Sequence, residues 1–148
     1  MNLLKNIRII GSHPEKAQIV SLLRRCDEEM RQKQERQILI LLDGEEMIPG
    51  GDFCGAACPM GAKPENIKNT VCYSTENIGA DIVALNVQEK PEYTCFELMA
   101  GNRMGRVFVS NKKGMGVQAV LITAAALMLC EIGLNELIAV LNGILKTD

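Results

Sequence analysis

The chain is short of aromatic side chains and has no excess of positive charge, and both features limit what it can bind. Among 148 residues it has no Trp, two Tyr and three Phe, so bases and sugars would find few aromatic platforms on which to stack. Its formal net charge is -2 at pH 7, whereas binding to a phosphate backbone requires many Lys and Arg acting together. We therefore expect no nucleic-acid partner.

Long apolar runs are also missing. The first eight residues contain no apolar run of signal-peptide length, and the most apolar stretch, 117–129, falls short of the roughly 20 residues that cross a bilayer. We expect a chain that stays in the cytoplasm and has no membrane partner. Because disulfides rarely persist in a reducing compartment, the six cysteines are expected to be free thiols.

The apolar pattern predicts strands that alternate with helices. We expect strands at 7–10, 37–42, 70–74, 81–87 and 106–109, helices at about 12–35, 92–100, 117–131 and 136–145, and a helical turn at 64–69. Ser12 and Glu15 have the spacing of a capping box, and Asn135 can cap the last helix. Residues 44–64, rich in Gly, Pro and Ala, are expected to be irregular. This order predicts a single α/β domain over residues 1–148, a three-layer sandwich with a mainly parallel sheet and helices on both faces.

The best local candidate for a site is segment 107–118, which has the pattern of a strand, a short Gly-containing loop and a helix start. Backbone N–H groups at a helix N-terminus lack internal partners and can hold a phosphate or carboxylate. The segment has neither the dinucleotide fingerprint nor the Lys-Ser/Thr ending of a P-loop, so a plain tight turn is the simpler interpretation. The candidate binding residues are Asn111, Lys112, Lys113, Gly114, Met115, Gly116 and Gln118.

Residues 48–145 resemble the dual-specificity protein phosphatases. The similar segments are 105–109, the Gly-containing loop after it, the Ala-rich helix around 127–128, the helix at 134–144 and, upstream, Ile48-Pro49-Gly50 with Gly55. That family hydrolyses phosphoesters with a Cys-x5-Arg loop, in which the thiolate attacks phosphorus and the Arg clamps its oxygens. Here the nucleophile position is Asn111 and the Arg position is Val117. The segment between 87 and 106 is also short for the family's helix there. The resemblance therefore implies a non-catalytic relative.

Cysteines form a second candidate site. Thiolates bind zinc and iron–sulfur clusters well, and Cys58 is followed by Pro as in ferredoxin-type runs. The spacing departs from known motifs, because zinc sites usually pair cysteines two residues apart and Gly61 stands where a radical-enzyme cluster motif has its third thiol. The alternatives are small buried core residues, or thiols with a redox or nucleophilic role. The candidate metal ligands are Cys54, Cys58 and Cys72.

These observations leave three classes of function open. The first is a non-catalytic domain that binds a small anionic ligand or a phosphoprotein. The second is a metal or iron–sulfur protein, and the third is a small enzyme that acts on a phosphorylated or carboxylated metabolite. His13 is the one histidine of the chain, and a single His without an identified partner is usually a surface or capping residue. Self-association into a homo-oligomer stays open.

Overall fold

The computed structural model of the chain describes residues 6–30, 36–43 and 51–146. A single sheet contains seven strands in sequence order. Strands β1 to β5 pair in parallel, whereas β6 pairs antiparallel with both β5 and β7. The prediction of an α/β fold with a mainly parallel sheet is confirmed. The strands are β1 (Ile7–Ile10), β2 (Ile38–Leu41), β3 (Gly55–Pro59), β4 (Thr70–Ser74), β5 (Ile82–Glu89), β6 (Tyr93–Ala100) and β7 (Arg103–Ser110).

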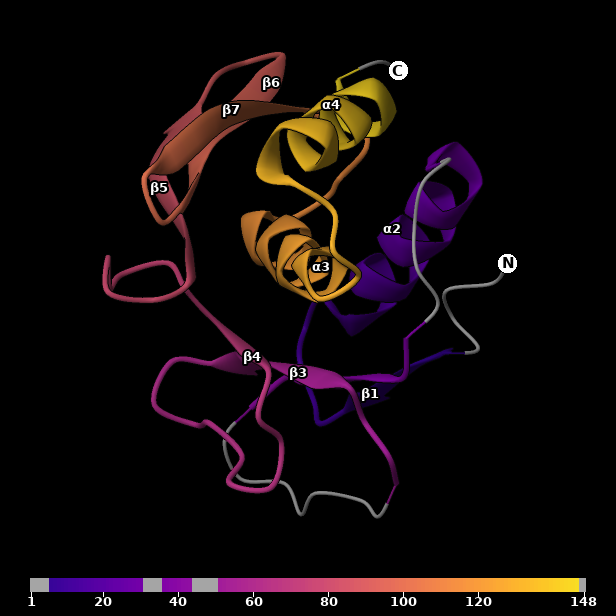
Figure 1. Cartoon of the computed structure of the whole chain (residues 1–148). Coiled ribbons are helices and arrows are strands. Elements are labelled where there is room, and N and C mark those ends of the chain that lie inside the picture. The colour runs from indigo at the N-terminus through magenta and orange to yellow at the C-terminus, as the bar shows by residue number, and fades with distance from the viewer. Residues whose placement is uncertain (1–5, 31–35, 44–50, 147–148) are drawn as a thin grey trace.

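The three described helices, α2 (Lys16–Glu29), α3 (Val117–Met128) and α4 (Leu134–Leu145), lie on one face of the sheet (Figure 1). Alternate strand residues such as Ile38 and Ile40 join them in one large core cluster. The other strand residues, such as Leu39 and Leu41, form a second cluster with Phe53 and Ile67 from the connecting segments. The expected helices on the second face are therefore not found in the described residues. The described connections on that face, 51–54 and 60–69, are too short and too rich in Gly and Pro to form a helical layer.

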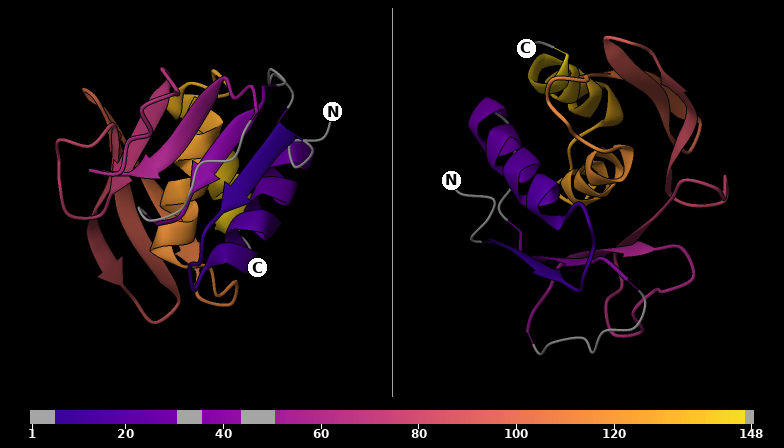
Figure 2. Two further views of the ribbon diagram at one scale, coloured as in Figure 1. Left: turned by 90° about the horizontal axis from the view of Figure 1, so that it is seen from below. Right: turned by 180° about the vertical axis from the view of Figure 1, so that it is seen from behind.

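The antiparallel part of the sheet turns away from the parallel part and packs on α4, as the two rotated views show (Figure 2). The helix approaches β7 so closely that a Cβ at Gly105 would overlap the side chain of Ile138. Asn142 on α4 then bonds the outer edge of β7, where its Oδ1 accepts from Phe108 N–H (2.9 Å) and its Nδ2 donates to the Arg106 carbonyl (2.9 Å). Over the described residues, no helix is both long and apolar enough to cross a membrane.

Most strand predictions are confirmed, and 70–74 agrees with β4 at both ends. The helix predicted at 92–100 is wrong, because these residues form β6, which pairs along its whole length with β7 through a turn at Gly101 and Asn102. The helical turn predicted at 64–69 is not formed, and only a turn at 65–66 is present. The segment expected to be irregular contains β3, whose small residues Gly55, Ala56 and Ala57 are buried.

The helix boundaries also differ from those predicted. The first helix begins at Lys16, and residues 31–35 of its predicted range lie outside the described residues. Its N-cap is Glu15, without a side-chain capping bond, so the predicted capping box with Ser12 is wrong. The N-cap of the last helix is Gly133 rather than Asn135. The Glu15 carboxylate is used elsewhere, at the start of α3.

Candidate functional site

The loop predicted to bind an anion does join β7 to α3. Because β7 runs parallel to β1–β5, α3 begins at the carboxyl edge of the sheet, where α2 also begins. There the Glu15 carboxylate accepts from Ala119 N–H (2.9 Å), and Gln18 Oε1 accepts from Gly116 N–H (2.7 Å). Two of the N–H groups at this helix start therefore already bind side chains from the N-cap and the first turn of α2.

Gly116 leaves the space that this carboxylate occupies, because a Cβ there would overlap the Glu15 side chain. His13 adds a second link, since its Nδ1 accepts from Glu15 N–H (3.0 Å) and its Nε2 lies 3.2 Å from Gln118 Oε1. Both bonds form when the neutral ring carries its proton on Nε2. The role of His13 and Glu15 depends on contacts with residues about a hundred positions away, which no local motif signals.

The other predicted residues of the loop do not converge on this place. Asn111 Nδ2 donates to the carbonyls of Lys90 (2.7 Å) and Pro91 (3.0 Å), so its side chain holds the β5–β6 connection. Met115 packs against the core. Lys112 is exposed, Lys113 is half-buried, and Gly114 adopts a φ of 64°. The structure thus brings Gly116 and Gln118 to the start of α3 and directs Asn111 to a hairpin.

Two of the three predicted metal ligands lie side by side. Cys58 on β3 and Cys72 on β4 are in register, and their sulfur atoms are 3.6 Å apart. Cys54 precedes β3 by one residue and is separated from Cys58 by four positions, about 13 Å along an extended chain. Within the described ranges, no three His, Cys, Asp or Glu side chains are grouped so that they could hold a metal ion.

The environment of Cys58 favours its protonated form. Burial, the contact with Cys72 and the negative charge of Asp81 together raise the pKa of this thiol from 9.0 to about 12, and the positive charge of Lys63 opposes them. Asp81 also accepts a hydrogen bond from Cys72 N–H (2.8 Å). One acidic and one basic side chain therefore act on Cys58.

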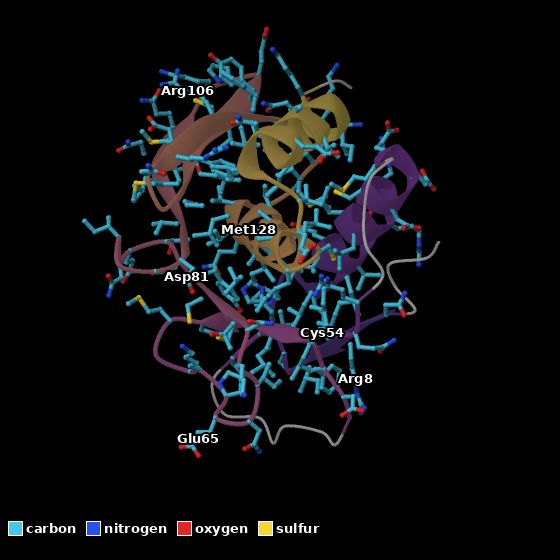
Figure 3. All side chains as sticks on the ribbon, in the orientation of Figure 1. Arg8, Cys54, Glu65, Asp81, Arg106 and Met128 are labelled. Atoms are coloured by element: carbon cyan, nitrogen blue, oxygen red, sulfur yellow. The ribbon has the colours of Figure 1, made fainter. Side chains whose placement is uncertain are left out.

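A cleft of about 450 Å³ lies at the opposite edge of the sheet, where the parallel strands begin. Residues that precede β2, β3, β4 and β5 meet there because parallel strands start at the same edge, and the end of α3 closes one side. Figure 3 labels three of these residues, Cys54, Asp81 and Met128. We call this the amino-edge cleft, and it is lined by Arg36, Cys54, Lys63, Lys68, Asn69, Thr70, Val71, Asp81, Met128, Leu129 and Glu131.

In the amino-edge cleft the acidic side chains have bonding partners, whereas two of the basic side chains have no acidic partner among the described residues. Glu131 pairs with Arg36 at 2.6 Å, and Asp81 accepts the Cys72 N–H bond. Lys63 and Lys68 are exposed and have no acidic partner within 4 Å among the described residues. The cleft therefore offers two ammonium groups to a ligand, while its two carboxylates already have partners.

Comparison with known proteins supports the fold alone. No family model matches the chain, and no curated protein matches it by sequence. Among solved structures, it resembles UDP-N-acetylmuramoylalanyl-D-glutamyl-2,6-diaminopimelate--D-alanyl-D-alanyl ligase from Acinetobacter baumannii, with a TM-score of 0.50 and 13% identity. It also resembles a crystal structure of MurF from the same organism, with a TM-score of 0.51 and 13% identity.

Both matches cover 71% of this chain but 28% of the other, so the chain spans less than a third of the length of these structures. At this identity the likeness shows the fold and assigns no reaction. The resemblance to dual-specificity phosphatases stays a prediction, because none of these comparisons bears on it.

Proposed function

We propose that the chain is a non-catalytic α/β domain that binds a small anionic ligand, a phosphate ester or a carboxylate, in the amino-edge cleft. The observation that carries this proposal is the placement of Lys63 and Lys68 around a 450 Å³ cleft whose carboxylates are already engaged. A cleft of this size lies within the range of small-molecule sites. Two ammonium groups on its rim favour a ligand of opposite charge.

The start of α3 is a weaker candidate for the same ligand. Glu15 already supplies a carboxylate to the α3 start, so we expect the anion in the amino-edge cleft instead. An external phosphate at residues 111–118 would have to displace that carboxylate and expose it to like charge. Lys112 and Lys113 could still attract a ligand to the start of α3. An experiment must therefore distinguish binding there from binding in the amino-edge cleft.

Binding without turnover is favoured by the composition of the lining. Cys54 and Thr70 are the side chains that could act as nucleophiles by thiol or hydroxyl attack, and such groups normally need a neighbouring base. The described lining contains no histidine. His13, the one histidine of the chain, lies at the other edge, where it bonds Glu15 and Gln118.

The test compares two pairs of lysines. Thermal unfolding is measured in rising concentrations of inorganic phosphate, a carboxylate panel and a UDP-linked sugar peptide, the last chosen because the ligase named above takes its name from such a compound. A ligand at a hundred times its Kd stabilises the folded state by about 2.7 kcal/mol, which raises the Tm by about 5–10 °C for a chain of this size.

The variant Lys63→Ala with Lys68→Ala should lose this ligand-dependent rise. The matched variant Lys112→Ala with Lys113→Ala removes the same charge at the other edge and should retain it. The opposite pattern would assign the anion to the loop before α3. Equal rises in both variants would contradict a lysine-based anion site at either edge.

A further inference from the structure

Cys58 and Cys72 are placed as partners on neighbouring strands. They occupy paired positions of β3 and β4 on the face without helices. Paired strands run about 4.8 Å apart, which lies within the Cα separation of 4.4–6.8 Å that disulfides span. With the sulfur atoms 3.6 Å apart, a bond requires them to approach by roughly 1.5 Å, since an S–S bond measures about 2.05 Å.

The two thiols differ in access. Cys58 is fully buried, whereas Cys72 is half-buried and reachable from solvent. Lys63 and Asp81 act electrostatically on Cys58, and both residues also line the amino-edge cleft. An oxidant therefore reaches Cys72 first, and Cys58 stands behind it as the second thiol. Cys54 is exposed and lies outside this strand pair.

We propose that Cys58 and Cys72 form a reversible disulfide, a modification site at which peroxides or low-molecular-weight disulfides oxidise this chain. This disulfide does not depend on the proposed anion site.

With hydrogen peroxide, the reaction has two steps. The Cys72 thiolate attacks one oxygen, the O–O bond breaks, and the departing hydroxide takes up a proton to become water, leaving Cys72 as a sulfenic acid. The Cys58 sulfur then attacks the sulfenic sulfur, the S–O bond breaks, and the Cys58 proton leaves with the oxygen as a second water. Two thiols and one peroxide thus give one disulfide and two waters. A dithiol reductant reverses the change by thiol–disulfide exchange.

The experiment treats the folded full chain with hydrogen peroxide, denatures it without reductant, blocks the remaining thiols and measures them by mass spectrometry. The wild type has six thiols before treatment. We expect four after treatment and six again after a dithiol reductant. Fragmentation of the cross-linked peptides should place the bond between positions 58 and 72.

Single variants identify the order of reaction. Cys58→Ser should stop at a sulfenic acid on Cys72 that a dimedone probe traps. Cys72→Ser should keep Cys58 reduced because this thiol is buried. Cys54→Ser, which removes an exposed cysteine outside the pair, should still lose two thiols on oxidation. Because the thiol count and the bond position are read in the wild type, the result does not depend on the variants folding.

Six reactive thiols after treatment of the wild type would overturn the proposal. A disulfide that joins Cys54 to either partner, or one that forms only between chains, would overturn it as well. Neither result would affect the lysine comparison described above.

Discussion

Glu15 occupies the start of α3 in the way that a bound anion would. Its carboxylate accepts from Ala119 N–H, and carboxylates at helix N-termini are stabilised by the unsatisfied N–H groups and the helix dipole. The spacing of Ser12 and Glu15 could not reveal this role of Glu15. The same local sequence is compatible with a capping box at the helix that follows and with a cap on a distant helix. The loop was predictable from its glycines, but its occupant was not.

We predict that Glu15→Ala lowers the free energy of unfolding by about 1–2 kcal/mol, because it removes the cap and the favourable charge at the start of α3. Urea unfolding measures the loss. Gly116→Ala should act in the same way, since its methyl group displaces the carboxylate. The double variant should lose less than the sum of the two single losses.

The control for this prediction is Glu28→Ala, an exposed acidic residue near the other end of α2. A surface substitution of this kind should change stability by less than about 0.5 kcal/mol. Full additivity of Glu15→Ala and Gly116→Ala would contradict the contact between the two positions.

Cys58 makes the stability of the chain depend on alkaline pH. In the unfolded chain its thiol ionises near 9.0, while in the folded chain burial holds the pKa at about 12. At a pH between these two pKa values, Cys58 loses its proton in the unfolded chain and keeps it in the folded chain. The contribution of Cys58 is therefore fully present below pH 9 and is lost as pH rises toward 12.

We predict that the stability advantage of the wild type over Cys58→Ala shrinks as pH rises above 9, as measured by urea unfolding at a series of pH values. Ile67→Val, a change in the same cluster without a titratable group, should cost the same at each pH. An advantage that stays constant up to pH 11 would contradict the protonated state of Cys58.

At the scale of elements, α4 and β7 form one unit. The sequence predicted both, yet not their contact, because Asn142 is 34 and 36 positions from the groups that it bonds on β7. The apolar pattern also predicted a helix where β6 stands. Its β-forming residues Tyr93, Thr94 and Phe96 and the Gly-Asn pair after Ala100 are hairpin signals, but acidic and apolar residues at 92–100 also fit a helical pattern. Pairing with β7 decides between the two.

We predict that Asn142→Ala costs about 1–3 kcal/mol of stability, since it removes two hydrogen bonds at the edge of the sheet. Hydrogen exchange at Phe108 N–H should speed up more than exchange in β2. Asn135→Ala, at an exposed position near the start of the same helix, should leave both quantities nearly unchanged. Unaltered exchange at Phe108 in Asn142→Ala would show that the amide does not hold this edge.

At the scale of the whole molecule, the alternation of strands and helices predicted the class of fold but not the arrangement of its layers. The three described helices gather on one face, and they stand in the chain before β2 and after β7. The small residues of β3 carry little hydrophobic periodicity, and this concealed a central strand. The amino-edge cleft escaped prediction for a related reason, because it joins the residues that precede four separate strands.

The most direct test of the central claim is a phosphate titration of the isotope-labelled chain, followed by amide chemical shifts in nuclear magnetic resonance spectra. We predict saturable shifts concentrated at Lys63, Lys68 and Asn69, which are reduced at higher ionic strength because the attraction is electrostatic. Amides of residues 111–118 should move little. Saturable shifts confined to 111–118, or no saturable shift in the spectrum, would contradict an anion site in the amino-edge cleft.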